Sequence, residues 1–252
     1  MTAFFSTSFD SLKPELLAIL GQFDRQGTLL YSGRNTVKCF AIGRYQINIK
    51  AFKKPNLINK IAYRYFRKSK ARRSFEHAGR LKALGVGTPD PVAYLEERGL
   101  VFGRSYYVSL QQACDWTFRD LIGHPEMHGR DGIIRQFVAF THQLHEKGVL
   151  FLDHSPGNTL IRRESAGRYA FYLVDVNRMR FDQQLDYKAR MANFSRLTNE
   201  RSLVREMARA YAALTGQNET MVFSDMWAAV EAFQNRFQRK HRWKRRLKFW
   251  KS

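Results

Sequence analysis

The chain has 252 residues, 44% of them hydrophobic and 14% aromatic, which argues against disorder and allows one large or two small packed domains. Its 43 Lys and Arg against 22 Asp and Glu give a net charge of +21, which favours a polyanionic partner, either nucleic acid or an anionic membrane. Two cysteines are too few for a disulfide framework, and neither a signal-peptide pattern nor an apolar run of about 18 residues is present. We therefore expect a cytoplasmic protein.

Three strands are predicted at 28–32, 36–42 and 44–52, with turns at Gly33-Arg34-Asn35 and at Gly43. The first turn stands where kinases keep a glycine-rich phosphate loop. Gly33 is the one glycine left of that pattern, so it is a candidate phosphate contact, while an ordinary hairpin explains the turn equally well.

The third strand contains Ile47-Asn48-Ile49-Lys50, the spacing of the kinase strand whose lysine reaches the α- and β-phosphates of ATP. Strand alternation puts the two isoleucines on one face and Lys50 on the other, where it would point into a cleft. Lys53 and Lys54 are nearby competitors for this role.

A helix is predicted at 69–84, ending at a turn of Gly85 to Pro89. It carries Glu76, the only acid between residues 25 and 89, and we expect a Lys50–Glu76 ion pair. The alternative is a surface pair of Glu76 with Arg72 or Arg80, one helical turn away.

Strands predicted at 92–95 and 100–110 complete a five-stranded lobe. Residues 111–115 would then form the hinge that contacts adenine. Gln111 opens this hinge and is a candidate nucleotide contact, although the pattern does not tell which residue binds the base.

Asp153 and Asn158 lie five residues apart between two short apolar runs, and Asp175 follows seventeen residues beyond Asn158. Phosphoryl transfer from ATP needs a carboxylate facing the attacking hydroxyl and oxygen ligands for Mg²⁺. Asp153 is therefore predicted to be the base, and Asn158 and Asp175 the Mg²⁺ ligands. So short a motif also occurs by chance, but here the surrounding elements follow the order of a kinase C-lobe. They are a helix through 133–144 and strands at 149–152, 159–162 and 169–174, with a turn at 164–167.

Positive charge gathers in two blocks. Residues 50–82 hold twelve Lys and Arg with one acid, and residues 236–252 hold nine with none. The second block, which we call the basic-aromatic tail, is interleaved with Phe237, Trp243, Leu247, Phe249 and Trp250. Read as a helix, it is typical of segments that lie among lipid headgroups, the alternative being a solvated tail.

From about Thr28 to Arg180 the chain resembles the lipopolysaccharide kinase family, the Kdo/heptose kinase branch of the protein-kinase-like superfamily. Lys-Ala-Phe-Lys-Lys-Pro at 50–55, Gly-Val-Gly-Thr-Pro-Asp-Pro at 85–91 and Asp-His-Ser-Pro-Gly-Asn at 153–158 carry the resemblance. It implies a kinase-like fold, use of ATP and Mg²⁺, and an envelope glycolipid as acceptor.

Several positions depart from protein kinases. Phe151-Leu152 replaces the His-Arg before the catalytic Asp, Ser155 replaces a lysine, and Asp175-Val176-Asn177 replaces Asp-Phe-Gly. No Ala-Pro-Glu follows, and little room is left for a peptide-binding segment, which disfavours a protein substrate. Ser155 is similar to the residue of RIO-type kinases.

The sequence thus predicts an α+β, bilobal protein-kinase-like fold with an antiparallel β-sheet N-lobe at 1–110, a mainly helical C-lobe at 111–235 and the basic-aromatic tail at 236–252. The predicted function is ATP- and Mg²⁺-dependent phosphorylation of a Kdo or heptose sugar in the lipopolysaccharide inner core. The partners would be a Kdo-lipid A type glycolipid and the anionic inner face of the inner membrane, where the protein would be peripheral. The alternatives are a RIO-like or atypical protein kinase and a basic nucleic-acid-binding protein. Oligomeric state is not predicted.

Overall fold

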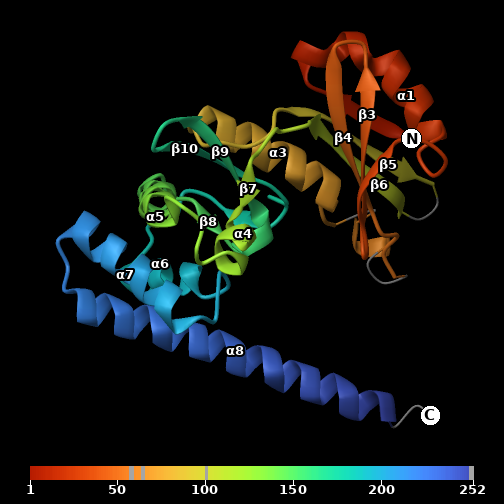
Figure 1. The fold of residues 1–252 in the computed structure, drawn as a ribbon. Coiled ribbons are helices and arrows are strands. Elements are labelled where there is room, and N and C mark those ends of the chain that lie inside the picture. The colour runs from red at the N-terminus through yellow and green to blue at the C-terminus, as the bar shows by residue number, and fades with distance from the viewer. Residues whose placement is uncertain (57–59, 64–65, 100–101, 250–252) are drawn as a thin grey trace. The chain divides into compact units, whose positions relative to one another are not determined.

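The computed structural model describes residues 1–56, 60–63, 66–99 and 102–249, which form two compact units (Figure 1). Unit 1 comprises Met1–Ala113 and Leu173–Arg178, and unit 2 comprises Cys114–Tyr172 and Met179–Ser252. The segment 173–178, which carries Asp175, therefore belongs to unit 1 although the chain on both sides of it belongs to unit 2.

Unit 1 is built on a six-stranded antiparallel sheet with the order β1-β5-β6-β4-β3-β2. Its elements are β1 (Thr2–Phe5), η1 (Thr7–Leu12), α1 (Lys13–Gly21), β2 (Thr28–Ser32), β3 (Thr36–Ile42), β4 (Tyr45–Phe52), α3 (Lys70–Ala83), β5 (Pro91–Arg98) and β6 (Phe102–Leu110). The five predicted strands and the helix are confirmed. The sheet has a sixth strand because β1 pairs with β5, with Phe4 opposite Tyr94.

The two faces of the sheet are covered by different helices. Ile47 and Ile49 are fully buried in one core with Leu16 and Leu20 of α1, as alternation along β4 predicted. Phe75 of α3 packs on the other face, against Tyr94 at 5.5 Å between ring centroids. Lys50 lies on this second face, since it alternates with the isoleucines.

Helix α3 begins where the sequence supplies a cap. The side chain of Ser69 accepts a hydrogen bond from the backbone N–H of Arg72 at 3.0 Å, which satisfies one of the free donors of the first turn. The helix ends at Ala83, and Gly85, two residues later, adopts a φ of +67°. Glycine takes this left-handed conformation without steric cost, so the chain can reverse there.

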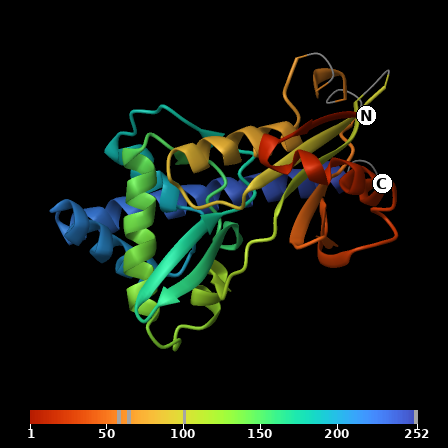
Figure 2. The ribbon, with the colours of Figure 1, turned by 90° about the horizontal axis from the view of Figure 1, so that it is seen from above.

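Unit 2 is mainly helical. Its elements are β7 (Trp116–Thr117), α4 (Phe118–Gly123), α5 (Arg130–Glu146), β8 (Leu150–Phe151), η2 (Pro156–Asn158), β9 (Thr159–Ser165), β10 (Arg168–Leu173), β11 (Met179–Arg180), α6 (Tyr187–Phe194), α7 (Arg201–Thr215) and α8 (Glu219–Phe249). Helix α5 lies alongside the β9–β10 hairpin (Figure 2), and Phe140 stacks on Phe171 at 5.4 Å. The helix and strands predicted around Asp153 are confirmed.

Helix α8 has two different halves. Its first half is part of the core, with Val222, Met226 and Val230 buried against α6 and α7. Its second half extends beyond those helices (Figure 1), and Phe237 and Trp243 are 51% and 67% exposed. The basic-aromatic tail is therefore the continuation of α8 as far as Phe249. Within the described ranges, no helix combines the length and apolar character that crossing a bilayer requires.

Candidate functional site

In unit 1, Lys50 contacts Asp175. The distance from Lys50 Nζ to Asp175 Oδ1 is 2.8 Å, and the two side chains are 15% and 29% exposed. The amide nitrogen of Asn177 donates to the same oxygen at 2.5 Å. Oδ2 of Asp175 accepts no hydrogen bond from the described residues, so one carboxylate oxygen is left for a further ligand.

The segment that carries Asp175 is fixed to the middle of α3 and to the turn that follows this helix. Leu173 donates its N–H to Gly87 O at 2.9 Å and accepts a bond from the Thr88 hydroxyl at 2.8 Å. The Nδ1–H of His77 donates to Val176 O at 2.7 Å. Burial lowers the pKa of His77, which favours the neutral ring. These contacts hold Asp175 in position, although Val176 and Asn177 replace the Phe and Gly of the Asp-Phe-Gly motif.

The structure corrects the expected Lys50–Glu76 ion pair. Glu76 pairs with Lys68 at 2.9 Å and with Arg72 at 2.8 Å, the surface arrangement that was the alternative. Burial alone would raise the pKa of Glu76, but the bonds from Lys68 and Arg72 outweigh it and lower the pKa. The physical reason is helical phase: His77 faces the 173–178 segment, and Glu76 lies about 100° around the helix from it.

Lys70, at the start of α3, lies close to this pair. Burial, followed by the charges of Arg34 and Arg73, lowers the pKa of the Lys70 ammonium group, and the charge of Lys50 acts in the same direction. Asp175 is the acid that opposes them. Lys70 thus experiences the charges of three other cations and of one carboxylate.

Gly33 and Gln111 are both engaged within unit 1. The N–H of Gly33 donates to Asn35 O at 3.1 Å across the hairpin turn. Gln111 donates its N–H to Gln46 O at 2.8 Å, and its side-chain oxygen accepts from Asn48 at 2.8 Å. Neither backbone N–H is therefore free for a nucleotide in this conformation.

In unit 2, Asp153 lies between β8 and η2 and is held by Arg196. Arg196 approaches Asp153 Oδ1 at 2.6 Å and also bonds Leu152 O at 3.3 Å. The amide nitrogen of Asn158 donates to Asp153 O at 2.8 Å, which closes the loop. Asn158 Oδ1 accepts no hydrogen bond from the described residues and is available to a ligand.

Beneath this loop lies a buried, neutral layer. The side-chain nitrogen of Asn193 donates to Phe151 O at 2.8 Å, and its oxygen accepts from His145 Nε2 at 3.0 Å. His154 is fully buried against Phe137 and Phe151. Burial lowers the pKa of His145 to about 4 and that of His154 to about 3, so both rings are neutral at pH 7.

Arg196 and Asn193 were not found by sequence reasoning. Each lies about forty residues from its partner in the loop and carries no motif. Only the packing of α6 against β8 reveals their positions.

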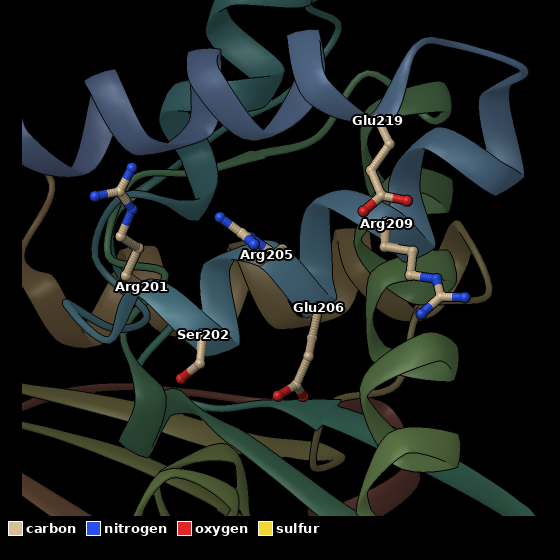
Figure 3. A pocket seen from close by; sticks show the side chains of 6 residues that line it. All are labelled: Arg201, Ser202, Arg205, Glu206, Arg209 and Glu219. Carbon is tan, nitrogen blue, oxygen red and sulfur yellow. The ribbon is translucent and has the colours of Figure 1, made fainter.

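A pocket of about 500 Å³ lies elsewhere in unit 2, along α7 (Figure 3). Its lining consists of Arg201, Ser202, Arg205, Glu206, Arg209 and Glu219. Glu206 is bound by Arg130 at 2.7 Å, and Arg201 and Arg205 lie over the ring of Phe223. None of the predicted site residues lines it, so we do not assign the chemistry to this pocket.

An antiparallel sheet that presents a lysine and an anchored aspartate, followed by a helical unit with an Asp-x-x-x-x-Asn loop, defines a protein-kinase-like phosphotransferase. A solved structure described as WaaP in complex with acyl carrier protein shares the fold, with a TM-score of 0.59 at 16% identity over 95% of this chain and 99% of that one. The chain belongs to the lipopolysaccharide kinase (Kdo/WaaP) family, whose sequence model matches residues 32–228. It is therefore a phosphotransferase that acts on a sugar hydroxyl. A search of curated proteins finds no match.

Proposed function

We propose that this protein transfers the γ-phosphoryl group of ATP to a sugar hydroxyl of the lipopolysaccharide inner core, with Kdo as the favoured sugar. The observation that supports it most is that Asp153, Asn158 and Asp175 each keep a side chain fixed by neighbours in their own unit, with an amide or carboxylate oxygen unengaged on Asn158 and Asp175. Fixed groups of this kind suit chemistry that depends on positioning and charge.

The residues fit ATP and Mg²⁺. Magnesium prefers oxygen ligands, and Asn158 Oδ1 and Asp175 Oδ2 are oxygens of the required types. Lys50 would bind the α- and β-phosphates, and Gly33 and Gln111 belong to the segments expected to border the phosphates and the base. When bound, Mg²⁺-ATP supplies the transferable phosphoryl group and a metal charge that offsets the negative charge of the phosphates.

Asp153 would act on the acceptor. Its carboxylate orients the sugar hydroxyl and accepts its proton as the oxygen attacks, while the bond to the leaving diphosphate breaks. Arg196 keeps the carboxylate from rotating, because it binds both Oδ1 and the preceding backbone carbonyl.

The acceptor would be reached at the inner face of the inner membrane. Each basic residue near an anionic surface contributes about 1 kcal/mol of attraction before screening, and exposed aromatics insert at headgroup level. The second half of α8 offers both, with Arg236, Arg239 and Lys240 beside the exposed Phe237 and Trp243. Exposed lysines of the 50–82 block, such as Lys53 and Lys54, would meet the anionic headgroup of the glycolipid.

Phosphotransfer from labelled ATP tests the function. The purified protein with Mg²⁺ is expected to label a Kdo-lipid A acceptor in mixed vesicles, and to leave a bulk protein mixture unlabelled. Label in protein would favour an atypical protein kinase, and salt-sensitive RNA binding with no turnover would favour a nucleic-acid-binding protein.

Removal of residues 236–252 tests the membrane contact separately. We expect the truncated protein to leave anionic vesicles and to lose activity on embedded acceptor, while activity on a soluble Kdo glycoside changes little. A Phe237→Ser, Trp243→Ser variant, which keeps all charges, should show an intermediate loss. If the truncated and full chains sediment equally with anionic vesicles, the basic-aromatic tail does not bind the membrane.

A further inference from the structure

Several cations act on Lys70 at the start of α3, and Asp175 is the acid that opposes them. Arg34, Lys50 and Arg73 all act on the charge of Lys70, and Asp175 is already paired with Lys50. Like charges held together in a half-buried place raise the free energy of the folded state unless a counter-ion joins them. A polyanion in this place would remove that cost.

One donor of the Arg73 guanidinium group lacks a hydrogen-bond acceptor. Its Nε is buried and has no hydrogen-bond partner, and the side chain forms no ion pair with the residues that the structure describes. Its neighbour Arg72 differs, because it binds Glu76 at 2.8 Å. Arg196 Nε of unit 2 is also buried without a partner, but Arg196 binds Asp153, whereas the guanidinium of Arg73 binds no acid among the described residues and is open to an anionic ligand.

Helical phase separates these two sets of cations. Lys70, Arg73 and His77 recur at spacings of three and four, so they share the face of α3 that meets the 173–178 segment. Lys68 and Arg72 bind Glu76 on a different face. The unbalanced cations are therefore on the same side as Lys50 and Asp175.

The hairpin turn lacks the run of glycines that lets a glycine-rich loop wrap its backbone donors around phosphates. Gly33 is its one glycine, and the N–H of Gly33 already bonds Asn35 O. Arg34, the next residue, contributes a side-chain charge instead.

We propose that Lys70 and Arg73, assisted by Arg34, bind the phosphate chain of the nucleotide and replace the missing glycine-rich loop. The proposal deepens the proposed function and rests on it. It assigns to the first turn of α3 a phosphate-binding role that Lys50 alone would otherwise carry.

The test is calorimetric titration with Mg²⁺-ATP and Mg²⁺-ADP in the absence of acceptor. Lys70→Gln and Arg73→Gln should each weaken ATP binding by roughly tenfold or more, as expected for a lost charge-assisted contact. Arg73→Lys should recover part of the loss. Adenosine binding, followed by ligand-observed NMR, should be unchanged, and inorganic tripolyphosphate should protect the wild type against heat more than either variant.

Lys68→Gln and Arg72→Gln are the matched controls, since each removes one charge within two residues of Lys70 and leaves Glu76 its other partner. Their ATP affinity should stay within about twofold of wild type, a difference of less than 0.5 kcal/mol. The proposal is overturned if the two pairs of variants lose equal ATP affinity, if adenosine binding falls along with it, or if only the Michaelis constant for the acceptor changes. A wild type that binds no nucleotide would instead overturn the proposed function itself.

Discussion

The Asp153 loop of unit 2 rests on buried, neutral hydrogen bonds, whereas Lys50 of unit 1 lies near other cations and pairs with the carboxylate of Asp175. Asn193 bonds both Phe151 O and His145 Nε2 beneath β8 without any ligand, although His145 Nδ1 and Arg196 Nε are buried without a hydrogen-bond partner. In unit 1 the unpartnered donor, Arg73 Nε, belongs to a group of cations that act on Lys70, which has no equivalent in the neutral layer of unit 2. Under the proposed function, this difference means that Asp153 is positioned before the substrates bind, whereas the cations of unit 1 gain an anionic partner only when nucleotide binds.

This comparison separates two kinds of experiment. Changes at Asp153 or in the layer beneath it should reduce turnover or stability and leave nucleotide affinity near the wild-type value. Changes in unit 1 should act through nucleotide affinity.

The largest effect is expected from Asp153→Asn. The amide keeps the shape of the side chain but cannot accept the proton, so the turnover number should fall by roughly 100- to 10,000-fold. Affinity for Mg²⁺-ATP, measured by calorimetry, should stay near the wild-type value because the nucleotide residues of unit 1 are unchanged. Full activity in this variant would show that Asp153 is not the proton acceptor.

Lys50 and Asp175 should behave as a coupled pair in nucleotide binding. Lys50→Met and Asp175→Ala should each weaken Mg²⁺-ATP binding strongly, and the double variant should lose less than the sum, with a coupling energy of about 0.5–3 kcal/mol. Lys50→Met and Glu76→Gln should instead be additive, because Glu76 contacts Lys68 and Arg72. Lys53→Met is the control for charge alone. Strong coupling between Lys50 and Glu76 would restore the pair that the sequence suggested.

Asn193→Ala should destabilise unit 2. It leaves the Phe151 carbonyl and the His145 ring without their partner in a buried place, at a cost of roughly 2–4 kcal/mol. Urea unfolding measures the change, and Asn199→Ala, at an exposed position of the same region, is the control. Equal midpoints for the two variants would show that the buried layer contributes little.

Acid should weaken the fold through the buried histidines. The folded-state pKa of His145 is about 4, below its ordinary value of 6.5, so the unfolded chain binds a proton that the folded chain does not. The contribution of the neutral His145 ring to the free energy of unfolding is therefore present above about pH 6.5 and is lost as the pH falls. At pH 5 the loss is roughly 2 kcal/mol for this ring. His145→Gln should flatten the urea-unfolding profile between pH 7 and pH 5. An unchanged slope would contradict the assignment.

Much of unit 1 was predictable because its signals are local. The period of two in β4 placed Ile47, Ile49 and Lys50 correctly, and Ser69 and Gly85 marked the ends of α3. The partner of Lys50 was not predictable from the scarcity of acids. The scarcity of acids says nothing about helical phase, and each residue along α3 is rotated by about 100° about the helix axis relative to the one before it.

The contacts around Asp153 could not be predicted from the sequence for a different reason. Its spacing to Asn158 is a local pattern, but Arg196 lies on the link after α6 and meets Asp153 only because α6 packs beneath β8. The same holds for β1, whose pairing with β5 joins residues about ninety positions apart. Long-range contacts of this kind have no short-range signature in one sequence.

Hydrogen exchange with and without Mg²⁺-ATP tests the contrast between the two units most directly. Peptides that cover 69–74 and 173–178 in unit 1 should gain protection when nucleotide binds, because its phosphates join the unbalanced cations. Peptides that cover 150–155 should be slow to exchange already and should change much less, since β8 and the loop are held by Asn193 and Arg196. Protection that appears mainly in 150–155, with none at the start of α3, would contradict the account.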